Sequence, residues 1–201
     1  MPTLFSYVVE HDGGHAPNPY FRVCTLCRCK FRESSDNPSN LVEKASAGDW
    51  VIGTGGANMK KSAGHGRLVY AMQVDEKLTR QQYFLDRRFR NKKPRQYGTY
   101  KQKQGDNEHP ANRFERDKQF VLVSRHFYYF GRNAIRIPKN KFHALEKRGP
   151  GFRYDFSNAY IARFVKWLQR FERGIHGDPC WKKELEDGFK RKGSDTCRSS
   201  C

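Results

Sequence analysis

The sequence predicts an α+β fold, with a small curved mixed sheet or a pseudo-barrel and flanking helices. Short runs rich in Val, Ile, Tyr and Phe alternate with segments dense in Gly, Pro, Asn and Asp, which is typical of strands joined by turns. One later segment has the apolar spacing of an amphipathic helix. Apolar residues make up only 36% of the 201 residues, but 15 Phe, 10 Tyr and 3 Trp each bury a large area, so a compact core is feasible.

The expected strands follow from β-branched and aromatic composition bounded by turn residues. The first run, FSYVVE, leads into HDGGHAPNPY, whose Gly, Pro, Asn and Asp residues indicate a turn. A later run, RLVYAMQV, is a stronger strand candidate than the short run that precedes it. The expected strands span residues 3–10, 22–30, 49–52, 67–74, 119–124, 126–130 and 134–137.

Three segments are predicted to be helical. Residues 41–47 suffice for one or two turns, and residues 78–90 have helix-compatible composition with Thr79 as the N-cap. The third helix has Ser157 as its expected N-cap and Gly174 as its stop. Its apolar residues at helical spacing are Tyr160, Ile161, Phe164, Val165, Leu168 and Phe171.

No repeat and no interdomain linker divides the chain. We expect residues 1–180 to form a single domain and residues 181–201 to be a polar, flexible C-terminal tail. Residues 91–109 have no periodicity and are expected to be a long loop.

The net charge is strongly positive. The chain has 39 Lys and Arg against 21 Asp and Glu, a formal charge of +18. Such a field attracts polyanions, so nucleic acid is the predicted partner, and a basic surface that serves only solubility is the alternative.

No apolar run is long enough to span a membrane, and the N-terminal residues lack the pattern of a secretory signal. We therefore expect a cytoplasmic protein with no membrane partner, whose six cysteines stay reduced.

A glycine-rich stretch, GDWVIGTGGANMKKSAGHG, lies between two expected strands. A P-loop needs G-x-x-x-x-G-K-[ST], but Lys60 replaces its second glycine. The dinucleotide fingerprint also fails, because Asn58 stands where its third glycine belongs. Two interpretations remain: a nest of backbone amides with Lys60 and Lys61 against a nucleic-acid backbone, or a flexible connection with solvated lysines.

A second basic stretch, residues 86–103, holds eight cations against one acid, and aromatic residues are interleaved with them. Phosphate contacts combined with stacking platforms suit single-stranded nucleic acid, whereas a solvated charge run is the alternative. The predicted nucleic-acid contacts in the two basic stretches are Lys60, Lys61, Arg87, Arg88, Arg90, Lys92, Lys93, Arg95, Tyr97 and Tyr100.

Cys24, Cys27 and Cys29 form a C-x-x-C-x-C pattern, and C-x-x-C is a common zinc-binding spacing. No second C-x-x-C completes the site, and the segment has the composition of a strand. Small buried thiols are favoured over a metal site, and no cofactor is predicted.

Four polar residues are candidates for catalysis. His11 and Asp12 follow the first expected strand, and Asp106 and Asn107 lie in a loop. Strand ends and loops are where functional groups gather, and a His–carboxylate pair can act as general acid and base. The sequence does not show that these residues converge, so ordinary turn residues are the alternative. No standard nucleophile, zinc-helix or deaminase motif is present.

Several stretches together resemble the nucleotide modification associated domain family, second type. They occur in order between about Phe5 and Pro179 and read FSYVVEHDGGHAPNPY, VCTLCRCK, AGDWVIGTGG, RLVYAMQV, QGDN, LVSRHFYYFG and FERGIHGDP. Cys27 is extra relative to the family pattern, and the region around QGDNEHP is shorter. The resemblance implies a role beside DNA-base-modifying enzymes of phages and bacteria.

A looser similarity, of the GDWV strand and the glycine stretch that follows it, is to the PUA-like superfamily with its EVE and YTH branches. This similarity implies a curved-sheet pseudo-barrel, in which several members hold a modified base between aromatic rings. The residues that it places around such a pocket are Asn18, Trp50, Gly53, Thr54, Gly55 and Phe130.

Two functions follow from these observations. The first is a module that recognises a modified or flipped DNA base in a pocket rimmed by residues 48–66, with basic loops on the phosphates. The second is an enzyme of DNA base or nucleotide modification that uses His11, Asp12, Asp106 and Asn107. A structural protein with an incidental basic surface is a weaker third interpretation.

Overall fold

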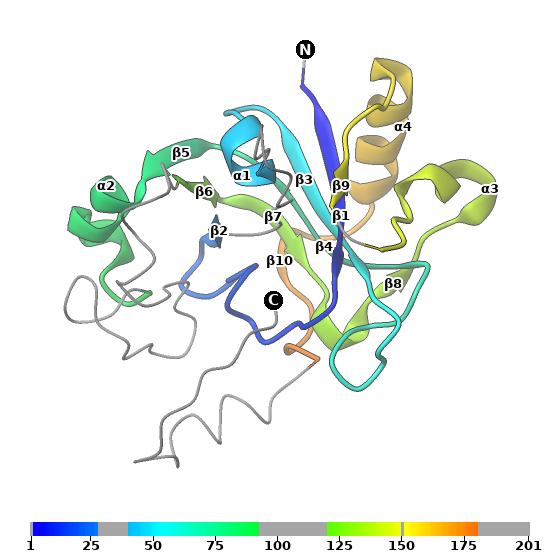
Figure 1. Ribbon diagram of the computed structural model, residues 1–201, viewed down its shortest axis with the longest axis horizontal. Coiled ribbons are helices and arrows are strands. Elements are labelled where there is room, and N and C mark those ends of the chain that lie inside the picture. The colour runs from blue at the N-terminus through cyan, green and yellow to red at the C-terminus, as the bar shows by residue number, and fades with distance from the viewer. Residues whose placement is uncertain (1, 28–39, 93–119, 150, 181–201) are drawn as a thin grey trace.

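A computed structural model of the chain describes residues 2–27, 40–92, 120–149 and 151–180, and its architecture is α+β as the sequence predicts (Figure 1). A mixed main sheet and a smaller antiparallel sheet form its framework. No closed barrel is found among these residues, which agrees with a curved sheet, and the PUA-like resemblance stays a prediction.

The main sheet is built around two parallel strands, β1 (Leu4–Val9) and β3 (Trp50–Gly55), which pair along their whole length from Leu4 with Trp50 to Val9 with Gly55. The strand order is β10-β7-β4-β3-β1-β9, and β8 pairs with β4 beside this path. The other strands of the sheet are β4 (Arg67–Gln73), β7 (His126–Tyr129), β8 (Ile135–Arg136), β9 (Phe152–Arg153) and β10 (Gly174–Ile175).

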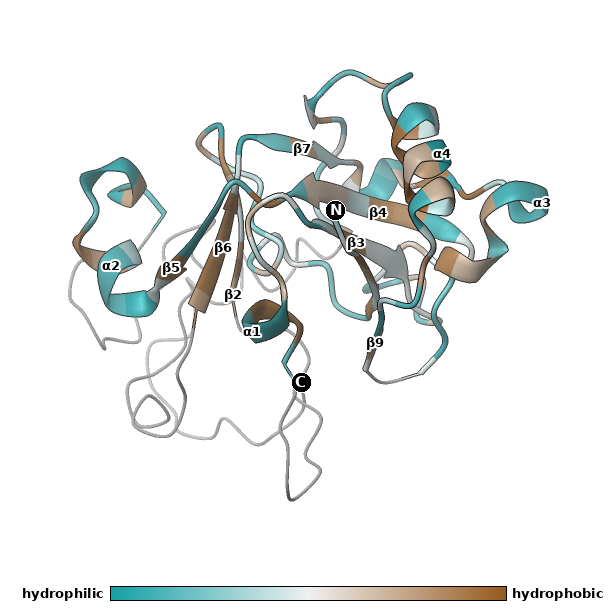
Figure 2. Ribbon diagram, turned by 90° about the horizontal axis from the view of Figure 1, so that it is seen from above, coloured by the Kyte–Doolittle hydropathy of each residue, from teal (hydrophilic) through white to brown (hydrophobic). Residues whose placement is uncertain are grey.

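The smaller sheet has the order β2-β6-β5, and its strands are β2 (Cys24–Cys27), β5 (Glu76–Thr79) and β6 (Phe120–Ser124). Because only Arg125 separates β6 from β7, one continuous stretch of chain passes from the smaller sheet into the main one. Seen from above, the smaller sheet lies to one side of the main sheet, and helices α3 (Lys139–Phe142) and α4 (Asn158–Leu168) lie to the other (Figure 2).

The two faces of the main sheet bury two separate cores, because alternate residues of a strand point to opposite faces. Phe5 and Tyr7 of β1 pack toward the smaller sheet and helix α1 (Leu41–Lys44), together with Leu26 and Leu122. Leu4, Trp50 and Ile52 pack on the opposite face against Ile161, Phe164 and Leu168 of α4. A third, smaller cluster lies around Tyr83 and Phe89, which belong to α2 (Arg80–Leu85) and η1 (Arg87–Phe89).

The sequence predicted most of the longer elements. The side chains of Ser157 and Thr79 accept hydrogen bonds from the backbone N–H groups of Tyr160 and Gln82, so both expected N-caps are confirmed. The expected helix over residues 78–90 was too long, since Glu76–Thr79 pair with β6 as a strand before α2 begins. The pairing of Leu78 with Val121 is a distant contact that local composition does not reveal.

The end of α4 was also predicted incorrectly. The helix ends at Leu168, and Gly174, with φ of +118°, begins β10 instead of stopping the helix. Two-residue strands such as β9 and β10 are defined by their partners across the sheet, so the sequence did not indicate them. The sequence also gave no indication of α3, η3 (Gly131–Asn133) or η4 (His143–Leu145).

Two glycines of β3 are required by close packing. A Cβ atom on Gly53 would overlap the Tyr70 ring and Val9, and a Cβ atom on Gly55 would overlap the carbonyl oxygen of Gly64. The pairing of β3 with β4 shifts register between Gly53 and Thr54, so a bulge lies at the same place. These glycines let the strand and its loop approach closely, which is a structural role.

We expect Gly55→Ala to lower the free energy of unfolding by about 2–4 kcal/mol, because the added methyl meets backbone, which cannot rotate away. Gly48→Ala is the control, since its φ is +93° but nothing lies within 4 Å of its Cβ position, and it should cost only about 1–2 kcal/mol of backbone strain. Urea unfolding of both variants measures the difference. Equal stability of Gly55→Ala and the parent protein would contradict this packing.

Candidate functional site

The carboxylate of Asp12 lies at the centre of a buried polar cluster at the carboxyl ends of β1 and β3. Asp12 is 1% exposed. The Tyr129 hydroxyl donates to its Oδ1 at 2.6 Å, and the backbone N–H of Cys180 donates to its Oδ2 at 3.2 Å. The backbone N–H of Asp12 donates to the carbonyl oxygen of Lys61 at 2.8 Å. The carboxylate thus connects three segments of the chain, and the backbone N–H of Asp12 adds a fourth.

Burial is the main influence on the ionisation of this cluster. It raises the pKa of Asp12 above 3.8, although the hydrogen bonds from Tyr129 and Cys180 oppose the shift. Burial and the neighbouring Asp12 charge also raise the pKa of Tyr129, so the phenol stays a donor. Burial raises the pKa of the Cys180 thiol to about 12, so this cysteine is not an activated nucleophile. The cluster therefore pairs a carboxyl of raised pKa with a phenol that keeps its proton, and its cysteine is not activated.

Lys92, a predicted nucleic-acid contact, lies in the interior and not at the surface. It is 1% exposed, and its ammonium group donates to the backbone oxygens of Asn18, Tyr20 and Val23 and to the Asn18 side chain, at 2.8–3.0 Å. Four oxygens compensate the buried charge. Lys92 therefore ties η1 to the loop after β1 and is not placed to contact a phosphate.

The other predicted cations differ in their surroundings. Arg88 forms ion pairs with Glu76 and Asp86, both at 2.6 Å, whereas Arg87 and Arg90 are exposed. Lys60 is exposed and Lys61 half-buried in the loop between β3 and β4. The predicted contacts Lys93, Arg95, Tyr97 and Tyr100 lie outside the described residues.

The structure does not bring the six predicted ligand-binding residues to one place. Gly53, Thr54 and Gly55 are buried within β3. Asn18 is buried beside Lys92, on the side of the smaller sheet, since its backbone pairs with Thr25 of β2. Trp50 and Phe130 belong to the opposite core, where Phe130 contacts Phe171 and His176.

Trp50 borders a surface depression between the amino end of β3 and α4. The depression has a volume of about 560 Å³, within the range of small-molecule sites. Its lining combines Trp50 and apolar residues of α4 with three amide side chains and the ammonium group of Lys166. Its full lining is Pro2, Trp50, Gln73, Asn158, Ile161, Ala162, Val165, Lys166 and Gln169.

An uncharged histidine stands beside this depression. The His126 ring meets the Trp50 ring edge-on, with centroids 5.1 Å apart. Burial, and then the Arg173 charge, lower the pKa of His126, so the imidazole is neutral at physiological pH. The aromatic end of the depression is therefore uncharged, and its cation comes from Lys166 on α4.

The depression and the Asp12 cluster lie at opposite ends of β3. Trp50 is its first residue and Gly55 its last, so about 17 Å of strand separates them. They are two sites, and the glycine-rich stretch touches both, through Trp50 at one end and Lys61 at the other.

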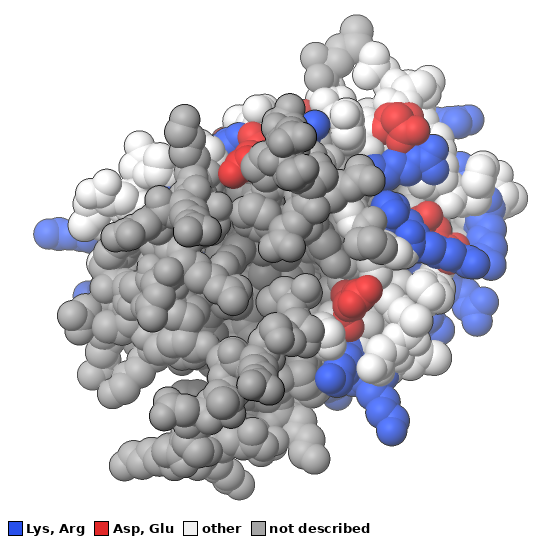
Figure 3. Space-filling model, in the orientation of Figure 1, with Lys and Arg blue, Asp and Glu red and all other residues white. Residues whose placement is uncertain are grey.

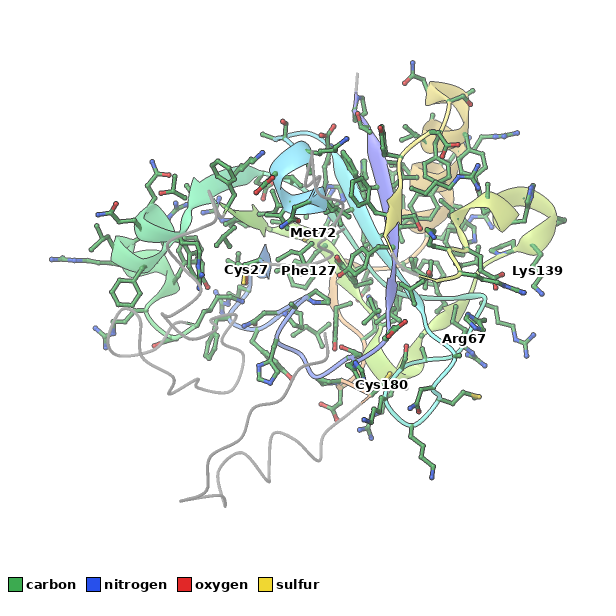
Figure 4. All side chains as sticks on the ribbon, viewed as in Figure 1. Cys27, Arg67, Met72, Phe127, Lys139 and Cys180 are labelled. Carbon is green, nitrogen blue, oxygen red and sulfur yellow. The ribbon has the colours of Figure 1, made fainter. Side chains whose placement is uncertain are left out.

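The cysteines of β2 do not converge on a metal. Cys24 packs into the core of the main sheet and Cys27 into the cluster around Tyr83, because residues three apart on a strand face opposite ways. Burial raises the pKa of Cys24 to about 12. Cys180 lies well apart from Cys27 (Figure 4). Among the described residues no group of His, Cys, Asp and Glu could hold a metal ion, and Cys29 lies outside them.

The remaining catalytic candidates are not assembled in the part of the chain that the structure describes. His11 is exposed next to the buried Asp12, and Asp106 and Asn107 lie outside the described residues. Of the four, only Asp12 has a defined buried environment.

The chain matches the family model described as nucleotide modification associated domain 2, over residues 1–120 and 108–186. The chain belongs to this family. The family resemblance read from the sequence is therefore confirmed, and the family description associates the chain with nucleotide modification. No curated protein and no solved structure matches the chain.

In this family member, sequence reasoning missed the partners of Asp12. Tyr129 and Cys180 are 117 and 168 residues away from it, and no local pattern indicates that they meet. It also missed the contribution of α4 to the Trp50 depression, although the polar residues on one flank of that amphipathic helix were a visible signal. No helix in the described ranges has the length and apolar character that crossing a bilayer requires.

We expect Asp12→Asn to change how stability depends on pH. The unfolded carboxyl titrates near 3.8 and the folded one higher, so the contribution of Asp12 is full below the unfolded pKa and lost as pH rises through the folded pKa. Relative to the parent protein, Asp12→Asn should therefore gain stability as pH rises from about 4 to about 8.

Urea titrations across this range measure the difference in unfolding free energy. Asp178→Asn, at an exposed aspartate near Cys180, is the matched control and should lack this trend. A difference between Asp12→Asn and the parent protein that does not vary with pH would contradict the buried carboxyl.

Proposed function

We propose that this chain is a nucleic-acid-associated module of DNA modification systems, which recognises a modified or flipped base. The observation that carries the proposal is the depression lined by Trp50, three amide side chains and one ammonium group. It lies at the Gly48 end of the glycine-rich stretch, since Gln73, which lines it, donates to the Gly48 carbonyl oxygen at 3.2 Å.

The chemistry of this lining suits a nucleobase. A base presents a flat apolar face and an edge of hydrogen-bond donors and acceptors. Amide side chains offer both a donor and an acceptor, so Gln169 can pair with such an edge, and Gln73 keeps its oxygen and one N–H beside the bond to Gly48. Lys166 supplies a positive charge for the phosphate of the same nucleotide. Apolar atoms of Ile161 and Val165 supply contact for the base itself.

The overall charge supports a polyanionic partner. The formal net charge of +18 gives a long-range attraction that salt screens, so binding to DNA should weaken steeply as salt is raised. Lys60, Arg87 and Arg90 are exposed cations that can serve this attraction, whereas the buried Lys92 cannot.

We expect Gln169→Ala to reduce discrimination between modified and unmodified DNA about fivefold or more, through loss of one hydrogen bond to the base. Lys166→Ala removes a phosphate contact, so it should weaken binding to modified and unmodified DNA alike. The probes are fluorescein-labelled 20-mers that each carry one modified base, such as N6-methyladenine, 5-methylcytosine or 5-hydroxymethyluracil, and the unmodified 20-mer. Fluorescence anisotropy gives the affinity ratios.

Two controls match these variants. Arg170→Ala removes one positive charge from the same helical region without touching the lining, and Gln81→Ala removes an exposed glutamine of α2. Both should leave the affinity ratio unchanged. Equal binding of every probe and of heparin by the parent protein would contradict base recognition.

A second function, catalysis of base or nucleotide modification, is favoured by the Asp12 cluster. A buried carboxyl with a raised pKa that accepts a hydrogen bond from a tyrosine is typical of a general acid or base. Lys61, whose carbonyl oxygen accepts from the Asp12 backbone, places a cation on the adjoining loop.

If the chain is an enzyme, Asp12→Asn should abolish a change in DNA nucleosides that expression of the parent protein produces. Nucleoside mass spectrometry of DNA from cells with and without each form is the measurement. Tyr129→Phe, which removes the hydroxyl but keeps the ring, should give partial loss. An identical nucleoside composition with and without the parent protein would contradict catalysis.

A further inference from the structure

The edge of the main sheet at β9 carries aromatic rings and cations in alternation. Strand β9 ends the sheet order, and its outer edge pairs with no other described strand. Tyr154, directly after it, is 49% exposed, which is unusual for so large a ring. The array consists of Lys44, Arg153, Tyr154, Phe156, Tyr160 and Arg163.

On one side of β9, contacts with Phe5 and Lys44 fix the orientation of the Tyr154 ring. It stacks on Phe5 of the adjacent strand, with centroids 5.8 Å apart and an interplanar angle of 27°. The ammonium of Lys44, from α1, lies 5.0 Å from the centre of the Tyr154 ring. The ring is therefore fixed in orientation before any partner arrives, while about half of it stays open to solvent.

On the other side of β9, cations and rings alternate toward α4. The Arg153 guanidinium lies 5.5 Å from the Phe156 ring, Phe156 stacks on Tyr160 at 5.3 Å and 17°, and the Arg163 guanidinium lies 5.9 Å from Tyr160. Arg153 pairs with the exposed Asp155 at 2.6 Å. A surface pair of this kind stabilises little, so a phosphate can replace its carboxylate at small cost.

The surroundings of the array are basic. Seen in the orientation of Figure 1, Lys and Arg side chains gather on the side that carries β9 and α3 (Figure 3). Arg67 and Lys139 lie on that same side (Figure 4). Arg67 stands directly opposite Arg136 in the pairing of β4 with β8, and like charges in that position repel. The Arg67 guanidinium donates to the Ala134 carbonyl oxygen at 2.8 Å, so this pair adds positive charge to that side of the molecule and is not part of the array.

We propose that the β9 array binds single-stranded nucleic acid, with a base stacked on Tyr154 and phosphates on Lys44, Arg153 and Arg163. Rings interleaved with cations are what an unpaired strand needs, since it exposes base faces as well as phosphates. An acidic peptide would use only the cations of the array. The exposed Tyr154 ring, whose orientation is already fixed, therefore favours nucleic acid as the partner.

This proposal rests on the proposed function only in taking nucleic acid as the partner. Tyr160 lies about 160° around α4 from Asn158 and Ala162, because successive helical residues are about 100° apart, whereas Arg163 is the i,i+3 neighbour of Lys166. Tyr154, which stacks on Phe5 on the face of the sheet opposite Trp50, therefore lies apart from the depression, so binding at this ring and binding in the depression can fail independently.

The test is the affinity of the full chain for a fluorescein-labelled (dT)15 strand. Tyr154→Leu, which keeps an apolar side chain on Phe5 but removes the π face, should weaken binding about 5- to 100-fold, as loss of one stacked base does. Tyr154→Trp should retain binding. Phe21→Leu is the matched control, because Phe21 is an equally exposed ring at 51%, outside the array, and this variant should bind as the parent protein does.

A second pair of variants, Arg163→Ala and Arg170→Ala, tests the array without changing Tyr154, so its result does not depend on how Tyr154→Leu affects folding. Arg163→Ala should weaken (dT)15 binding more than Arg170→Ala, which removes the same charge from an exposed position just after α4 and outside the array. Tyr154→Leu should leave affinity for heparin and for polyglutamate nearly unchanged, because neither ligand stacks.

The outcomes are distinguishable. If Tyr154→Leu and Arg163→Ala bind (dT)15 within twofold of the parent protein, the array is not the site. If Tyr154→Leu weakens heparin and polyglutamate as much as (dT)15, the surface binds polyanions without stacking, and the proposal is overturned. Loss of (dT)15 binding with the modified-base ratio intact supports the array, and a parent protein that lacks base discrimination overturns only the proposed function.

Discussion

The parallel pairing of β1 with β3 is the constraint on which the rest of the structure depends. Parallel strands need a long connection, and here about 40 residues, including β2 and α1, lie between Val9 and Trp50. The pair is buried on both faces, so it separates the two cores and fixes the curvature of the sheet around them. The bulge at Gly53 and the close approach of Gly55 to Gly64 adapt β3 to its neighbours.

The same pair also decides where the candidate sites lie. At the amino end of β3, Trp50 faces α4, and at the carboxyl end of β1 the chain continues into the loop of Asp12. Strand β9 pairs with the edge of β1 that β3 does not occupy. Three sites of different chemistry thus arise from one structural unit. They are an amide-lined depression, a buried carboxyl–tyrosine cluster and an aromatic–cation edge.

Two buried charged side chains hold the loop that follows β1. Asp12 connects it to β7 and to the segment before residue 181, and Lys92 connects it to η1 through four oxygens. A buried charge without such partners would cost several kcal/mol, so these contacts have to form together with the core. Polar residues that the sequence suggested as reactive or phosphate-binding therefore have structural roles as well, and in Lys92 the structural role replaces the expected one.

Local sequence was sufficient to predict the α+β class, the central strands, the caps at Thr79 and Ser157 and the family, because these depend on local periodicity and short motifs. Other features became visible only in the folded chain. Strands β5, β9 and β10 form against distant partners, and Lys92 is buried. Cys24 and Cys27 face different cores, and the Tyr129 hydroxyl reaches Asp12. Each of these depends on which distant segment lies alongside. The residue type limits the chemistry of a side chain, but its burial and its contacts with distant segments decide which role it has in the folded protein.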